Sequence, residues 1–124
     1  MQKSILFLLS LFVISGVFAQ SHNFSKVPGV VVNYEPAQNK RFLGSPSICV
    51  LPNGTYIVSH DYFGPESNCK THAQTFVFES KNKGQSWEKI ATINQFWGGL
   101  FFHNNALYIM GCDNEKGNLI IRKS

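Results

Sequence analysis

Short apolar runs separated by turn sequences recur along the chain, and this pattern constrains the fold more than any other feature. The runs are rich in β-branched and aromatic residues and alternate with turns such as "PNG" (residues 52–54), "NKG" (82–84) and "HNN" (103–105). Asparagine and glycine tolerate the positive φ angles of tight hairpins. No window shows a sustained helical period, so the sequence predicts an all-β domain, which is a sandwich, a barrel or a propeller.

The apolar runs mark where strands are expected. Seven of them are joined by turns or loops, and an eighth, "GVVVNY" at residues 29–34, precedes them as a further outer strand. Because hairpin turns connect neighbouring strands, the strands are expected to pair in antiparallel fashion. The seven strands are expected at residues 46–51, 55–60, 75–79, 87–93, 99–103, 106–111 and 118–123.

Two parts of the chain resemble each other. Residues 47–61, "SICVLPNGTYIVSHD", align without a gap on residues 99–113, "GLFFHNNALYIMGCD". A repeated hairpin of this kind is typical of folds built from one supersecondary unit. The ungapped alignment pairs Ile48 with Leu100, Tyr56 with Tyr108, Ile57 with Ile109 and Asp61 with Asp113.

A second match follows the first in the same order. "FVFES" (residues 76–80) aligns on "IIRKS" (residues 120–124), which pairs Ser80 with Ser124. The spacing differs from that of the first match because the loop after the hairpin is longer in the first copy. Two hairpin strands and a third strand, repeated with the variation confined to one loop, predict a β-propeller of four-stranded antiparallel blades.

The turn "SKNKGQSW" (residues 80–87) resembles the Asp-box, Ser-x-Asp-x-Gly-x-x-Trp, of the sialidase-type β-propellers. Ser80, Gly84 and Trp87 match the motif, and Asn82 stands where the family has aspartate. A hydroxyl and a short acceptor side chain would bind backbone N–H groups of the turn. Glycine permits a left-handed residue, and the tryptophan packs under the hairpin. The alternative is a solvated turn with a chance tryptophan.

The resemblance extends over residues 28–124 and is to bacterial exo-α-sialidase-like proteins, also called BNR-repeat proteins. It implies a six-bladed propeller, of which residues 20–124 would be the N-terminal part: a closing strand, one full blade and most of a second. In this family the Asp-box lies away from the active site, so its residues would be structural. A piece of this kind would expose an open strand edge and an apolar blade face, and we expect it to aggregate.

The resemblance implies a substrate face formed by the loops after the second strand of a blade and between blades. Family enzymes carry an aspartate acid/base on an early loop, and Asp61 matches that placement. His60 beside it would orient a sugar hydroxyl or share the proton. The alternative is that Asp61 caps its loop, as Asp113 would in the second copy. The candidate residues of this face are Arg41, His60, Asp61, Tyr62, Gln95, Phe96, Trp97, Asp113 and Asn114.

The first carboxylate-binding arginine of the family has no counterpart at its usual position. Aligning the family's Phe-Arg-Ile-Pro element on "LGSP" puts Gly44 there. Arg41 would reach the pocket by another backbone path, or is simply a surface residue. Phe96 and Trp97 would form a sugar-stacking wall, or pack between blades. The family's tyrosine nucleophile, its glutamate partner and two further arginines belong to later blades and have no counterpart in this chain.

The first residues have the layout of a secretory signal peptide. One lysine precedes an apolar run, and Val17-Phe18-Ala19 reads as a cleavage site before Gln20. The run is short for a bilayer span, which needs about 20 apolar residues; a retained anchor is the alternative. The sequence thus predicts that residues 1–19 are removed after Ala19, that no span remains, and that the protein is secreted or periplasmic.

Charge and cysteines narrow the functional classes further. The net charge is +4, but the basic residues are scattered, so no nucleic-acid surface is expected. No metal or cofactor motif is present in the sequence, and none is expected. Cys69 and Cys112, both near loops, are the candidate pair in an oxidising compartment, while Cys49 is expected to be a small buried hydrophobe.

Two functions remain from the sequence. The first is a secreted exo-glycosidase of sialidase type that releases terminal sugars, including sialic acid, from glycans. Asp61 would be its catalytic residue, and Arg41, His60, Tyr62, Gln95 and Trp97 would bind the substrate. The second is a non-catalytic propeller that binds glycans or proteins. Gly44 in the arginine position favours binding, whereas "SHDYFG" and "QFW" on one predicted face favour hydrolysis.

Overall fold

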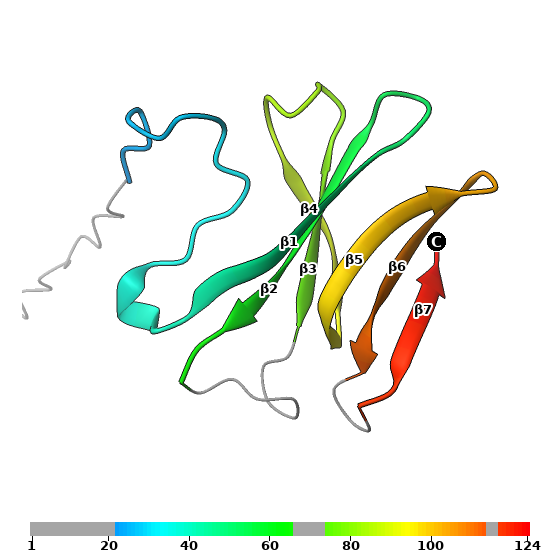
Figure 1. Cartoon of the computed structure of the whole chain (residues 1–124). Coiled ribbons are helices and arrows are strands. Elements are labelled where there is room, and N and C mark those ends of the chain that lie inside the picture. The colour runs from blue at the N-terminus through cyan, green and yellow to red at the C-terminus, as the bar shows by residue number, and fades with distance from the viewer. Residues whose placement is uncertain (1–21, 66–73, 114–116) are drawn as a thin grey trace, which may run out of the picture.

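A computed structural model describes residues 22–65, 74–113 and 117–124; the expected signal peptide lies outside them. The fold consists of two antiparallel sheets, with strand orders β1-β2-β3-β4 and β5-β6-β7 (Figure 1). Each strand pairs with the next strand along the chain. The strands are β1 (Phe42–Val50), β2 (Tyr56–Phe63), β3 (Thr75–Ser80), β4 (Glu88–Ile93), β5 (Gln95–His103), β6 (Ala106–Asp113) and β7 (Leu119–Lys123).

The all-β fold class and the seven expected strands are confirmed. Strands β1 and β5 begin several residues earlier than expected, because a β-bulge carries each strand past residues that would otherwise end it. These residues are Pro46 in β1 and Gly98 in β5. Neither sheet closes on itself within the described residues.

Residues 29–34, for which we expected an outer strand, form none. They run as irregular backbone and lead into a short 3₁₀ turn, η1 (Ala37–Asn39). A strand needs a neighbour that pairs its N–H and C=O groups, and no strand of the described residues pairs with this segment. The strand was expected to close a ring with a later blade, so it stays a prediction.

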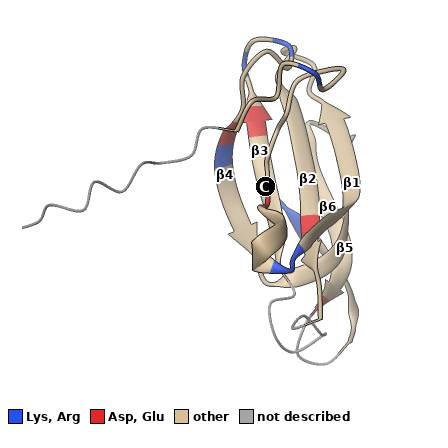
Figure 2. Ribbon diagram, turned by 90° about the vertical axis from the view of Figure 1, so that its left-hand side faces the viewer, with Lys and Arg blue, Asp and Glu red and all other residues tan. Residues whose placement is uncertain are grey.

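Charged side chains are spread thinly over the fold. In the view of Figure 2, lysine and arginine occupy separate places on the ribbon and form no stripe. Two ion pairs join Arg41 to Glu35 and Lys81 to Glu79. Within residues 22–65, 74–113 and 117–124, no helix has the length and hydropathy that a membrane span requires.

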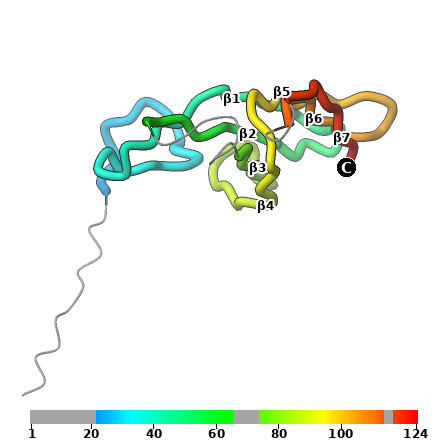
Figure 3. The backbone as a smooth tube through the Cα atoms, turned by 90° about the horizontal axis from the view of Figure 1, so that it is seen from below, coloured from blue at the N-terminus to red at the C-terminus, as the bar shows by residue number. Residues whose placement is uncertain are grey.

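The two sheets pack against each other through β5, which contacts β1, β2 and β3. Seen from below, the second sheet lies on one side of the first sheet and the N-terminal segment on the other (Figure 3). Ile57 and Val77 of the first sheet and Ile109 of the second are the buried centre of the core. The partly buried side chains around them are Leu51, Ala91, Ile93, Leu100 and Leu107.

A β-bulge interrupts the first strand of each sheet at an equivalent place. The first bulged residue has a positive φ in both strands, 48° at Ser45 and 57° at Trp97. Positive φ is uncommon outside glycine, so two such residues at matching positions are not a coincidence of local sequence. The two hairpins share one backbone plan, as the internal repeat predicted.

The pairing beside the bulges corrects the expected alignment by one residue. Gly44 lies opposite Asp61, whereas the equivalent Phe96 lies opposite Cys112 and not Asp113. The second hairpin has one residue fewer between equivalent strand pairs than the first. An ungapped alignment therefore assigns each residue of β2 to a residue of β6 that is one position too late. The register retains the matches of Ile48 with Leu100 and of Ser80 with Ser124.

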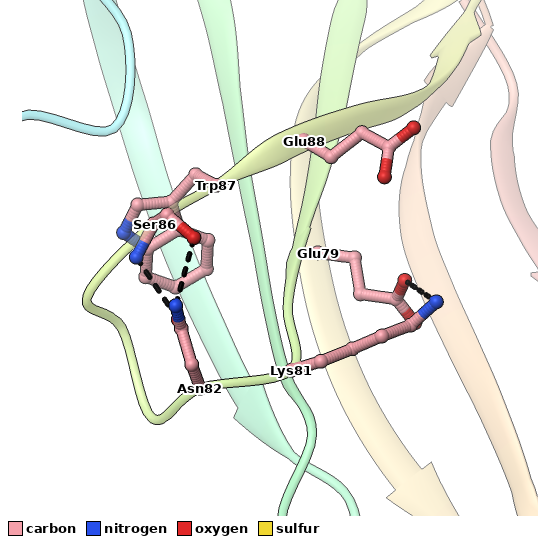
Figure 4. A pocket seen from close by; sticks show the side chains of 6 residues that line it. All are labelled: Glu79, Lys81, Asn82, Ser86, Trp87 and Glu88. Carbon is pink, nitrogen blue, oxygen red and sulfur yellow. Dashed lines mark hydrogen bonds and ion pairs between the residues drawn. The ribbon is translucent and has the colours of Figure 1, made fainter.

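The turn at residues 80–87 has the local bonding that its residues predict (Figure 4). The Ser80 hydroxyl accepts the N–H of Gly84 at 2.8 Å, and the Asn82 Oδ1 accepts the N–H of Ser86 at 2.9 Å. Gly84 has a φ of 86°, which a side chain rarely adopts. The Trp87 indole N–H donates to the Gly84 carbonyl at 3.1 Å, so the turn satisfies its own polar groups.

Cys49 and Cys112 are free thiols in the structure, and both are partly exposed. Burial still raises the pKa of the Cys49 thiol. Cys49 is therefore unbridged, as expected, but it is not fully buried. Cys69, the expected partner of Cys112, lies outside the described residues.

Candidate functional site

The candidate residues lie at the end of the sheets opposite the 80–87 turn. In the register of β2 and β3, Asp61 pairs with Thr75 at this end, whereas Tyr56 pairs with Ser80 at the other. The expectation that the 80–87 turn lies away from Asp61 agrees with this register. The last residues of β2, β4 and β6 and the first residues of β3, β5 and β7 lie at the Asp61 end (Figure 1).

The Asp61 carboxylate is buried between the two sheets, with 0% of the residue exposed. Its Oδ1 accepts the Thr75 hydroxyl at 2.5 Å, and its Oδ2 accepts the backbone N–H of Trp97 at 2.5 Å. Hydrogen bonds this short to an ionised group are among the stronger polar contacts in proteins. Asp61 therefore joins β2 to β3 and to β5.

Burial raises the pKa of Asp61 above the ordinary value of a carboxyl. Hydrogen bonds from the Thr75 hydroxyl, the Trp97 and Gly98 N–H groups and the Ser45 hydroxyl act in the opposite direction. The carboxyl is thus surrounded by donors from three strands. A substrate would have to displace these donors before it could touch the acid.

Trp97 is a strongly exposed aromatic residue at this end, with 62% of the residue accessible; Phe42, at the start of β1, is similarly exposed. It stands at the first position of the β5 bulge, and its φ of 57° is an outlier for a bulky residue. The edge of the Phe96 ring lies against it, with ring centroids 4.8 Å apart. Trp97 thus presents its ring to solvent, while Phe96 is half-buried.

Gln95 lies fully buried behind Trp97. Its backbone carbonyl accepts the Thr75 hydroxyl at 3.3 Å, and its Oε1 accepts the Arg122 Nε–H at 3.2 Å. Its Nε2 has no hydrogen-bond partner, and it is the one buried side-chain polar atom of the described residues without one. The expectation that Gln95 contacts substrate is not met by this placement, because the residue has no accessible surface.

His60 and Asp61 point to opposite faces of the first sheet, because neighbouring side chains alternate along a strand. The His60 ring stacks on Phe76 and Phe78, with centroids 5.6 and 5.4 Å away. The only Asp61 atom with which the ring forms a hydrogen bond is the backbone carbonyl oxygen, at 3.3 Å. The expectation that His60 shares a proton with the Asp61 carboxyl is corrected by this alternation.

The His60 ring is buried in the face that the N-terminal segment covers. Its Nε2 lies 2.9 Å from the Asn33 Nδ2, which fits a neutral ring whose Nδ1–H donates to the Asp61 carbonyl. Burial lowers the pKa of His60, and the Asp61 carbonyl partly opposes this. His60 is therefore held as a neutral hydrogen-bonding group.

Arg41 and Tyr62 lie near His60 and not near Asp61. The Arg41 guanidinium donates from Nε and Nη2 to one oxygen of Glu35, at 3.1 and 2.9 Å. It also lies over the Tyr62 ring, 4.7 Å from the centroid. Burial raises the pKa of Glu35, but hydrogen bonds from Asn39, Tyr62 and Arg41 outweigh it and lower that pKa. Arg41 is thus already paired with a carboxylate.

Gly44 has no room for a side chain. A Cβ at this position would meet the Phe63 ring at 2.6 Å, closer than real contacts allow. A side chain at position 44 would therefore require the Phe63 ring to turn aside. In this structure that ring occupies the space that an arginine at position 44 would need.

Asp113 caps its loop, which was the alternative expected for both aspartates. It accepts the N–H of Gly117 at 3.1 Å and the side-chain amide of Asn118 at 2.8 Å. Asn114, the remaining candidate, lies outside the described residues.

The candidate residues thus form two groups on opposite faces of the first sheet. Asp61, Gln95 and Trp97 lie on the side of the second sheet, and Arg41, His60 and Tyr62 on the side of the N-terminal segment. Sequence reasoning missed four polar partners of these groups. The glycines and the proline beside the bulges were a signal for Ser45, and strand alternation was one for Thr75. The missed partners are Asn33, Glu35, Ser45 and Thr75.

No family model matches the chain, and no curated protein or solved structure is significantly similar to it.

Proposed function

We propose that the chain is part of an exported Asp-box propeller that binds a glycan, with the indole of Trp97 as the stacking surface for a sugar ring. The observation that carries this proposal is an exposed tryptophan held at a positive φ at the Asp61 end of the sheets. A large aromatic ring offers an apolar surface that suits the C–H face of a pyranose. Its cost in backbone strain is typical of functional positions.

The propeller is supported by the internal plan of the two sheets. Both begin with an inner strand that carries the same bulge, and both continue outward along the chain in the same order. The turn at residues 80–87 has the bonding that an Asp-box needs. Repetition of one sheet plan in sequence is what a blade array requires.

Binding is favoured over hydrolysis by the state of the groups that hydrolysis would use. The Asp61 carboxyl is buried and accepts bonds on both oxygens. Arg41 is paired with Glu35, and the Phe63 ring occupies the space beside Gly44 that a second guanidinium would use. An acid/base and a carboxylate clamp both need free access to the sugar.

Hydrolysis of a terminal sugar is the second candidate, and one observation favours it. Burial raises the pKa of Asp61, which is how a carboxylic acid is kept protonated to donate to a leaving oxygen. The residue would then have to exchange its present donors for substrate. Release of a fluorescent alcohol from a sialoside, lost in Asp61→Asn, would support this candidate.

Glycan binding is tested on the purified chain with an array of immobilised glycans, sialylated and neutral. Trp97→Ala should weaken binding to the preferred glycan about tenfold, as expected for about 1.4 kcal/mol of lost stacking. The matched control is Trp87→Phe, which changes the chain's other tryptophan at the far end and should bind as the original does. Equal binding by Trp97→Ala and the original chain would contradict the proposal.

A further inference from the structure

The two bulges differ in what occupies the strained position. Ser45 is small, whereas Trp97 is bulky, and a bulky residue at positive φ is the stronger outlier. Such a conformation persists only where the surrounding structure imposes it. Something in the structure must therefore hold the Trp97 backbone.

The contact that holds it is the bond from the Trp97 N–H to the Asp61 Oδ2 at 2.5 Å. The other carboxylate oxygen is anchored on Thr75, so the acceptor cannot follow if the bulge relaxes. The next residue, Gly98, fits so closely that a Cβ would lie 2.9 Å from the Thr75 methyl and 3.1 Å from the Ile109 side chain. The bulge is thus held on one side by a hydrogen bond and on the other by close packing.

We infer that Asp61 is a positioning residue, whose carboxylate holds the Trp97 bulge in its left-handed conformation and so directs the indole into solvent as a ligand surface. The positioning is independent of any ligand. Only the use of the indole for a sugar ring rests on the proposed function, so the two can fail separately.

The equivalent position in the second sheet shows what the carboxylate adds. Cys112 stands where Asp61 stands in the first sheet, and a thiol is a weak acceptor. The first sheet therefore carries an acceptor that its own repeat lacks. That acceptor receives the Trp97 N–H of one bulge and the Ser45 hydroxyl of the other, and Trp97 is the bulky residue of the two.

The test follows the motion of the Trp97 indole, with Trp87→Phe as background so that Trp97 is the sole tryptophan. Time-resolved fluorescence anisotropy of the whole chain measures how much of the indole signal decays by fast internal motion. Asp61→Ala removes the acceptor. Asp61→Asn keeps one carbonyl for the Trp97 N–H, while its amide can donate to the Thr75 hydroxyl. Thr75→Val removes only the anchor on the other oxygen.

Asp61→Ala should raise the amplitude of the fast component at least twofold and weaken glycan binding by a similar factor to Trp97→Ala. Asp61→Asn should restore both the restrained indole and glycan binding. If Asp61 acted by proton transfer instead, asparagine could not replace it. Thr75→Val removes the anchor but keeps the acceptor, so it should raise the fast component by less than Asp61→Ala does. An indole equally restrained in folded Asp61→Ala and the original chain overturns the inference. So does an increase in Thr75→Val as large as that in Asp61→Ala.

If Asp61→Ala does not fold, the double variant Asp61→Ala with Trp97→Gly decides the question by circular dichroism. Glycine enters the left-handed region freely, so it should restore the folded state if the carboxylate serves to hold a positive φ. Failure of glycine to restore the fold overturns the inference. Unchanged glycan binding in a folded Asp61→Ala whose indole has become mobile contradicts the proposed function instead and leaves the positioning intact.

Discussion

The two ends of the first sheet satisfy the hydrogen bonds of their polar groups in different ways. At the 80–87 turn, buried or half-buried polar groups are satisfied by partners within four residues along the chain. At the other end, Asp61 is satisfied by Thr75 and by Trp97, which lie 14 and 36 residues away in sequence. One end is a local structure, whereas the other exists only once both sheets are packed together.

This difference determines which end stabilises the contact between the sheets. The turn can form in a single hairpin, so its bonds contribute nothing to the position of the second sheet. The Asp61 bonds cross from β2 to β5 and are buried, where an unpaired donor costs more than it does in water. Variants at the two ends should therefore differ in size and in what else they disturb.

Asp61→Ala should have the largest effect on stability. It leaves the part-buried Trp97 N–H without its acceptor and the buried Thr75 hydroxyl with only its longer bond to the Gln95 carbonyl. At about 1–3 kcal/mol for each buried unsatisfied group, the free energy of unfolding should fall by about 3 kcal/mol or more. Urea unfolding followed by circular dichroism measures this loss.

The control for Asp61→Ala is Ser59→Ala, a truncation on the same buried face of β2. The Ser59 hydroxyl donates to the Gly98 carbonyl at 3.5 Å, which is a long and weak bond. Its loss should cost about 1 kcal/mol or less. If the two variants were equally stable, the Asp61 end would not be the tie between the sheets.

The same contrast explains how much of the molecule its sequence predicted. The seven strands, the repeat and the bonding of the 80–87 turn follow from periodicity and from residues within a few positions of one another. The one-residue slip in β6 did not, because an ungapped alignment takes no account of turn length. Glycine in a strand signals a bulge, and Gly98 was a usable sign of it.

Two partners of the candidate residues lay beyond sequence reasoning for a physical reason. Arg41 contacts Glu35 and His60 contacts Asn33, and both partners lie in irregular backbone before β1 that no strand pattern places. Asp61 was expected at a surface, and packing of the second sheet buried it. Which side chains a second sheet covers depends on how the sheets are placed, and no pattern within one strand encodes that.

Ser80→Ala should have the next largest effect on the free energy of unfolding. It measures how much the hydrogen bonds of the 80–87 turn contribute to stability. The Ser80 hydroxyl is buried, accepts the Gly84 N–H and donates to the Asn82 Oδ1, both at 2.8 Å. Losing both bonds should lower the free energy of unfolding by about 1–2 kcal/mol. Hydrogen exchange should show the loss at residues 81–87, with the inter-sheet amide of Trp97 unaffected. Faster exchange at Trp97 would mean that the two ends are coupled.

The pH dependence of stability should also differ between the two ends of the sheet, by a smaller amount. Burial raises the pKa of Asp61 in the folded chain, so the folded state holds this proton more tightly than the unfolded state does. The contribution of Asp61 to stability is therefore highest below the ordinary pKa of 3.8 and falls as pH rises from there to the folded-state pKa.

Urea midpoints of the original chain and Asp61→Asn, measured from about pH 3 to about pH 8, isolate this term. Glu35 titrates in both proteins, so its contribution cancels in the difference. The cost of Ser80→Ala should be flat over the same range, because neither Ser80 nor Asn82 ionises. A difference between the original chain and Asp61→Asn that grows in favour of aspartate as pH rises would contradict the raised pKa.

Asn82→Asp should have the smallest effect and should be stabilising. The Asn82 Oδ1 already accepts the Ser86 N–H at 2.9 Å and the Ser80 hydroxyl at 2.8 Å, and a carboxylate accepts such bonds more strongly. The amide bond to the Ser86 hydroxyl is replaced when that hydroxyl rotates to donate. We expect a gain of about 0.5 kcal/mol above the carboxyl pKa and none below it. Asn82→Ala, the matched control, should lose about 1 kcal/mol at any pH. If aspartate destabilised the turn, donation from the Asn82 amide would be its essential bond, and this end would be less self-sufficient than its geometry indicates.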